Sequence, residues 1–89
     1  MEIKLERLKQ PGDLGTISKM INTRVVETAH FDINMEDIDH ISLASFNALV
    51  KLYVKLKRMG KGLTYIKCHS ERMKALIHKT QLSNVFITD

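Results

Sequence analysis

The chain has 89 residues, 44% of them hydrophobic and 27% charged, and a formal net charge of +4. This length predicts a single domain over residues 1–89 with one modest core, and the composition excludes intrinsic disorder. The sequence shows no apolar run near the roughly 18 residues of a membrane span, no secretory signal and only one cysteine, Cys68. We therefore expect a cytoplasmic protein.

The first half of the chain predicts a strand, a helix and a second strand. Residues 2–8 alternate charged and apolar side chains, which indicates a short edge strand. A Pro-Gly-Asp turn follows, and apolar residues then recur at helical spacing over residues 14–28, with Asp13 or Thr16 as the candidate N-cap. Residues 31–35 alternate strictly, which predicts the second strand.

The second half predicts a long helix, a strand, a further helix and a last strand. The long helix covers residues 43–59 and ends at Gly60, a residue that tolerates the left-handed conformation after a helix. Residues 63–68 have the composition of a strand, a helix follows Ser70, and residues 85–89 close the chain as a strand. The apolar residues of the long helix are expected on one broad buried face: Phe46, Leu49, Val50, Leu52, Tyr53, Leu56 and Met59.

This alternation of strands and helices on short connections indicates a mostly parallel central sheet. We expect a single small α/β domain with about four strands and about three helices. No catalytic triad, phosphate-binding loop, cofactor motif or cluster of metal-ligand residues is present in the sequence. The sequence therefore predicts a protein that is not an enzyme and that needs no metal or cofactor.

The positive charge permits two interpretations. Lys51, Lys55 and Arg58 lie on one side of the predicted long helix, and such a face can bind the phosphates of a nucleic acid. The chain has only two Tyr and three Phe for base stacking, so solvated helix faces are the favoured interpretation. Nucleic-acid binding stays as an alternative, as does self-association through a sheet edge, which would give a homodimer.

Within residues 31–88 the chain carries, in order, the segments FDINMEDIDHI, SLASF, NALVKLYVKLKRMGKGLTYIK and RMKALIHKTQLSNVFI. In this order the chain resembles the STAS domain, the family of bacterial anti-sigma-factor antagonists and related modules. The resemblance implies a non-enzymatic regulatory module of bacterial signal transduction that acts by protein–protein docking. The implied partner is an anti-sigma factor or switch kinase, or alternatively the ATPase of a lipid-transport ABC system.

The chain departs from this family where the family places its phosphorylated hydroxyl. Ser42 stands at the family's aspartate, Leu43 and Ala44 stand at the two hydroxyl positions, and Ser45 stands at the glycine. The resemblance therefore implies a docking site without direct phosphorylation, with Ser45 or Ser42 as the alternative modified residue. From the residues alone, Ser42 is an N-cap that accepts a hydrogen bond from the amide of Ser45.

We expect the partner interface at this strand–helix junction. Exposure of both Leu43 and Phe46 would indicate a contact surface, whereas burial of both would make the junction part of the core. The predicted interface residues are His40, Ser42, Leu43, Ala44, Ser45, Phe46 and Asn47.

Overall fold

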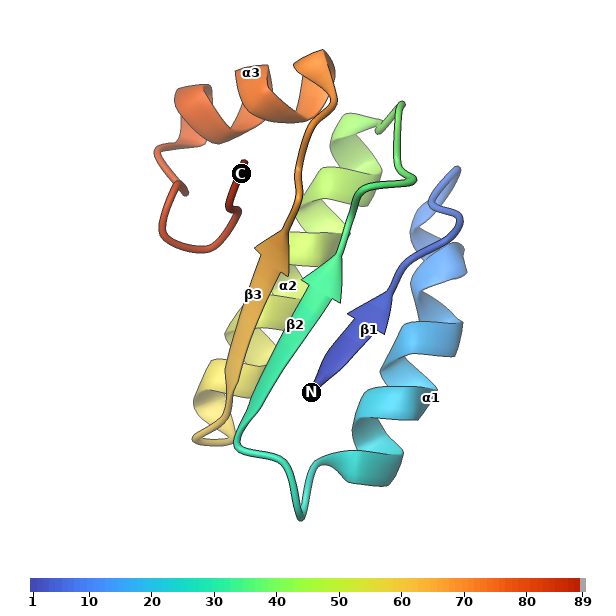
Figure 1. The fold of residues 1–89 in the computed structure, drawn as a ribbon, viewed down its shortest axis with the longest axis vertical. Helices are drawn as coiled ribbons and strands as arrows, with labels where there is room; N and C mark the ends of the chain where they lie inside the picture. The colour runs from blue at the N-terminus through green and yellow to red at the C-terminus, as the bar shows by residue number, and fades with distance from the viewer. Residues whose placement is uncertain (89) are drawn as a thin grey trace.

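The computed structural model describes residues 1–88, in which three strands alternate with three α-helices (Figure 1). This confirms the predicted α/β class. A short 3₁₀ helix, η1, precedes the first α-helix. The elements in chain order are β1 (Glu2–Lys4), η1 (Pro11–Leu14), α1 (Gly15–Arg24), β2 (His30–Asn34), α2 (Leu43–Arg58), β3 (Gly62–Ile66) and α3 (Glu71–Thr80).

The three strands form a parallel sheet in the order β1-β2-β3. The predicted fourth strand is reduced to a single parallel bridge between Tyr65 and Phe86, and Asp89 lies outside the described residues. The amides of Val85 and Phe86 bond back to the carbonyl of Leu82, so the chain is still turning where the bridge forms. The sheet therefore has three strands and one bridged segment, close to the expected four.

The sheet has one covered and one open face. The residues that face the helices are buried: Ile3, Phe31, Ile33, Leu63 and Tyr65. Helix α2 lies behind β2 and β3 in Figure 1 and covers this face. The opposite face carries polar side chains, where the imidazole Nε2 of His30 lies 3.1 Å from both Asp32 Oδ1 and Thr64 Oγ1. Because parallel sheets are usually covered on both faces, this polar surface is a distinctive feature of the fold.

Two element boundaries in the N-terminal third differ from those expected. The strand predicted over 2–8 ends at Lys4, because the amide of Leu5 makes the last bond to β2 before the chain turns toward η1. The helix predicted over 14–28 ends at Arg24, where β-branched valines follow. Its N-cap is Leu14 without a side-chain bond, so Thr16 does not cap it.

Asp13, the other candidate N-cap, acts one turn earlier than predicted. Its carboxylate Oδ2 accepts hydrogen bonds from the amides of Lys9 (2.8 Å) and Gln10 (3.1 Å), directly before η1. Asp13 therefore satisfies free amides at the start of the 3₁₀ helix rather than those of α1.

Helix α2 begins at Leu43 as predicted, but its buried face is narrower than expected. The buried residues are Ser45, Phe46, Leu49, Leu52 and Leu56. The prediction placed Val50, Tyr53 and Met59 on this face, yet the first two are only half-buried and Met59 is exposed. On a helix of 3.6 residues per turn these three positions lie at the margins of the buried stripe.

Candidate docking site at the start of α2

Ser42 caps helix α2 in an extended conformation typical of this position. Its hydroxyl oxygen accepts a hydrogen bond from the amide of Ser45 at 3.1 Å, as the sequence predicts. The same hydroxyl donates to the hydroxyl oxygen of Ser45, also at 3.1 Å. Both functions of the Ser42 hydroxyl are thus used within the first turn of the helix.

Aromatic packing on the core side supports the first turn of α2. The ring of Phe46 stacks on Phe86 with a centroid distance of 4.9 Å, and Phe86 stacks on Tyr65 at 4.7 Å. The buried Tyr65 hydroxyl donates a 2.7 Å hydrogen bond to the carbonyl of Leu49, one turn further along α2. Strand β3 and the bridged segment thereby fix the position and the rotation of the helix start.

The predicted interface residues divide into a surface group and a supporting group. His40, Ser42, Leu43, Ala44 and Asn47 are exposed. Ser45 and Phe46 are buried, with exposed fractions of 0% and 1%, and they lie beneath the surface instead of on it. Leu43 is 54% exposed, so the junction is neither a fully exposed apolar patch nor only core.

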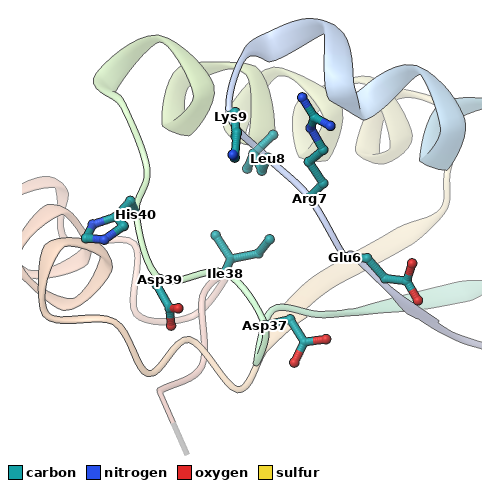
Figure 2. A pocket seen from close by; sticks show the side chains of 8 residues that line it. All are labelled: Glu6, Arg7, Leu8, Lys9, Asp37, Ile38, Asp39 and His40. Atoms are coloured by element: carbon teal, nitrogen blue, oxygen red, sulfur yellow. The ribbon is translucent and has the colours of Figure 1, made fainter.

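The loop between β2 and α2 also borders a small pocket of about 190 Å³. Its walls are the segment that follows β1 and the loop that follows β2, which meet at the carboxyl ends of the strands (Figure 2). Arg7 and Lys9 come from the first wall, and Asp37, Asp39 and His40 from the second. The pocket is smaller than typical small-molecule sites and mixes both signs of charge, so it does not favour one ionic ligand.

Two acidic side chains near this pocket, Glu36 and Asp37, pair with the same cation. The ammonium of Lys4 lies 3.2 Å from Asp37 and 3.5 Å from Glu36. The hydrogen bond and the charge of Asp37 raise the pKa of Lys4 above its usual value. Within residues 1–88, no three His, Cys, Asp or Glu side chains are arranged to hold a metal ion. The described geometry provides a protein surface, and it provides no metal centre in this part of the chain.

The outward side of α2 carries Val54, which the sequence did not predict as a buried or an interface residue. Val54 is 37% exposed, and Val50 is half-buried beside it. Leu43, Asn47, Val50 and Val54 are spaced by four, three and four residues, which places them on one side of the helix. This spacing is visible in the sequence, but the predicted broad buried face of the helix included Val50.

Of the helices in residues 1–88, none combines the length and the apolar content needed to cross a bilayer. A family model described as "STAS domain" matches residues 13–89. A search of curated proteins and a search of solved structures each found no match. The matched region covers both α2 and the strands that position it.

Proposed function

Because the chain belongs to the STAS domain family, we propose that it is a protein-docking module whose contact surface is the start of α2. Members of this family generally act as regulatory or interaction modules and are generally not enzymes. The observation that carries the proposal is Leu43, a large apolar side chain that is 54% exposed at the first position of a capped helix. Exposed apolar groups on a rigid support favour contact with another protein.

Docking at this surface does not require phosphorylation of the chain. The exposed side chains at the family's hydroxyl positions, Leu43 and Ala44, have no hydroxyl group. The Ser45 hydroxyl is fully buried, and a kinase could reach it only after the first turn of α2 opened. Ser42 is exposed, but its hydroxyl caps the helix. These features support a surface that is constantly available to its partner.

The proposed partner is a regulatory protein of the bacterial cytoplasm, an anti-sigma factor or a switch kinase. The family resemblance supports this class, and the ATPase of a lipid-transport ABC system is the alternative within the same family.

A nucleic acid is a second candidate partner, because α2 carries four cationic residues and no acidic one. Its binding would weaken by orders of magnitude between low and physiological salt.

A site-specific photocross-linker tests the docking surface directly. The linker replaces Ala44 in one variant and Lys79, an exposed residue of α3, in the control variant. Both variants are expressed in the source cells and irradiated, and cross-linked proteins are identified by mass spectrometry. We expect position 44 alone to capture a kinase, an anti-sigma factor or a transporter ATPase. The same proteins captured from both positions, or none from position 44, would reject the proposed site.

Intact-mass analysis of the chain isolated from the same cells tests the absence of phosphorylation. We expect the unmodified mass at all growth stages. A phosphate adduct that maps to Ser42 or Ser45 would contradict a constantly available surface and would indicate a switch at the cap.

A further inference from the structure

The docking surface continues from the helix start along the outer side of α2. Leu43, Asn47, Val50 and Val54 form a stripe, here called the α2 seam, with a spacing of four, three and four residues. This is the 3.5-residue repeat with which one α-helix packs along another. Leu43, Asn47 and Val54 are exposed and lie away from the buried residues Leu49, Leu52 and Leu56, whereas Val50 is half-buried and packs partly against the core. The outer side of α2 is therefore shaped to receive a helix.

The charges beside the seam define the chemistry of that helix. Lys51 follows Val50 by one residue, and Arg58 follows Val54 by four residues. The two cationic residues are one heptad apart, so they lie on the same flank of the seam. Together with Lys55 and Met59 they line a shallow hollow around the two valines. Neither Lys51 nor Arg58 makes an ion pair with a residue of the described part of the chain, 1–88. The flank thus offers cations that are free for acidic side chains of a partner.

Two other occupants fit the seam less well. A second copy packed symmetrically through its own α2 would place Lys51 and Arg58 against the same cations of its partner, which is repulsive. A nucleic acid would meet the apolar side chains Leu43, Val50 and Val54 along the centre of the surface, where they offer its phosphates no hydrogen-bond donor. An apolar centre with a cationic flank instead matches an amphipathic helix.

We infer that the α2 seam binds an amphipathic helix of a partner protein, whose apolar stripe packs on Leu43, Val50 and Val54 and whose acidic flank pairs with Lys51 and Arg58. This inference rests on the proposed docking function and specifies the structure and the charge of the partner segment. The seam contributes shape and apolar contact, and the cations select partners that carry glutamate or aspartate beside the contact stripe.

The test uses a designed probe with this chemistry. The probe is a three-heptad peptide with leucine and isoleucine at the seam-facing positions and glutamate at all flanking positions, so that it repels itself. A matched peptide carries lysine at the same flanking positions. Each peptide is titrated into the isotope-labelled chain at low salt while amide shifts are followed by NMR. We expect the glutamate peptide to bind, to shift residues along 43–58, and to weaken as salt screens the exposed charges.

Variants of the chain separate the contributions of charge and apolar contact. Lys51→Glu with Arg58→Glu is expected to weaken binding of the glutamate peptide about tenfold. Val54→Asp is expected to weaken it by at least about tenfold. The control, Lys19→Glu with Lys79→Glu, makes the same change in net charge at exposed sites on α1 and α3 and should leave binding unchanged. Circular dichroism of each variant verifies that the fold is kept.

Several results would overturn the inference. These are no binding at low salt, equal binding of the glutamate and lysine peptides, or shifts centred away from α2. If the chain bound vesicles with anionic lipid, or a random DNA duplex, through α2 more tightly than it binds the glutamate peptide, the seam would be assigned to that partner instead. Specific cross-linking at Ala44 without peptide binding would keep the proposed docking function and reject the helical acidic partner. Peptide binding without such cross-linking would support an acidic helix on the seam and reject the start of α2 as the docking surface.

Discussion

Ser42 illustrates how one side chain determines the character of the proposed site. Its hydroxyl accepts a hydrogen bond from the Ser45 amide and donates one to the Ser45 hydroxyl oxygen. The second bond gives the buried Ser45 hydroxyl a partner. An N-cap of this kind contributes about 1 kcal/mol to the stability of its helix. The residue at the family's aspartate position is therefore a structural element of this chain, and the neighbouring Leu43 is free to serve as the contact.

Substitution of Ser42 measures this structural contribution. We expect Ser42→Ala to lower the free energy of unfolding by about 1–2 kcal/mol, because both bonds to Ser45 are lost. Ser42→Asp should stay within about 0.5 kcal/mol of the parent, since aspartate is an equally good N-cap. Urea titration followed by circular dichroism gives both values. Equal destabilisation by alanine and aspartate would show that the cap is not the source of the effect.

At the scale of the elements, α2 depends on a segment distant in sequence. The bridged segment reaches the helix through Phe86, which lies between Phe46 and Tyr65 in the aromatic stack. The carbonyl of Tyr65 accepts from the amide of Ile87, and its own amide donates to the carbonyl of Val85. These bonds attach the segment to β3 and bring the Phe86 ring beneath the first turn of α2.

Replacement of Phe86 by leucine tests this connection. We expect Phe86→Leu to cost about 1–2 kcal/mol of stability, because the volume is nearly kept while two aromatic contacts are lost. Hydrogen exchange of the Ser45 and Phe46 amides should accelerate more than that of α1 amides. Thr88→Ala, at an exposed neighbouring position, should change stability by less than about 0.5 kcal/mol. Uniform acceleration throughout the chain would contradict a specific link to α2.

The elements differ in how far the sequence predicts them. The start of α2 follows from local chemistry, because Ser42 can cap it, and Gly60 follows its end with the positive φ expected there. The burial of Ser45 does not follow from its polarity, since it depends on the packing of the stripe of α2 that Ser45 shares with Leu49, Leu52 and Leu56. The predicted fourth strand is limited by a local turn, because the amides of Val85 and Phe86 bond to the carbonyl of Leu82 before the ladder can extend.

The seven residues predicted for the interface differ in exposure, and the sequence predicts that difference only in part. Five of the seven predicted residues are exposed, whereas Ser45 and Phe46 are buried. Both lie on the buried stripe of α2, which is centred on Leu49, Leu52 and Leu56. Val54 was not among the predicted residues, because a single valine on the exposed side of a helix is common.

At the scale of the whole molecule, one core lies between the helices and a single face of the sheet. Its Cα radius of gyration of 12.0 Å is that of a compact domain of this length. Two ionisable groups, Cys68 and Tyr65, are buried in this core. Burial raises the pKa of Cys68 from its ordinary value of 9.0 to about 12, and it also raises that of Tyr65.

These shifts predict a loss of stability in alkaline solution. Between about pH 9 and pH 12 the unfolded chain releases the Cys68 proton that the folded chain keeps. The stabilisation is therefore complete below about pH 9 and declines as the pH rises toward 12. Urea midpoints of the parent and of Cys68→Ala, measured from about pH 8 to about pH 10.5, should converge as the pH rises. Parallel pH profiles of the two proteins would show that Cys68 does not contribute.

The aromatic stack beneath α2 also has a consequence for the newly made chain. Synthesis proceeds from the N-terminus, so Ser42 and Leu43 leave the ribosome long before Phe86 does. Until Phe86 emerges, Phe46 and Tyr65 lack the ring that stacks between them, and the first turn of α2 lacks this part of its support. A partner that recognises this turn is therefore expected to bind chains that contain Phe86 more tightly than nascent fragments that stop before it.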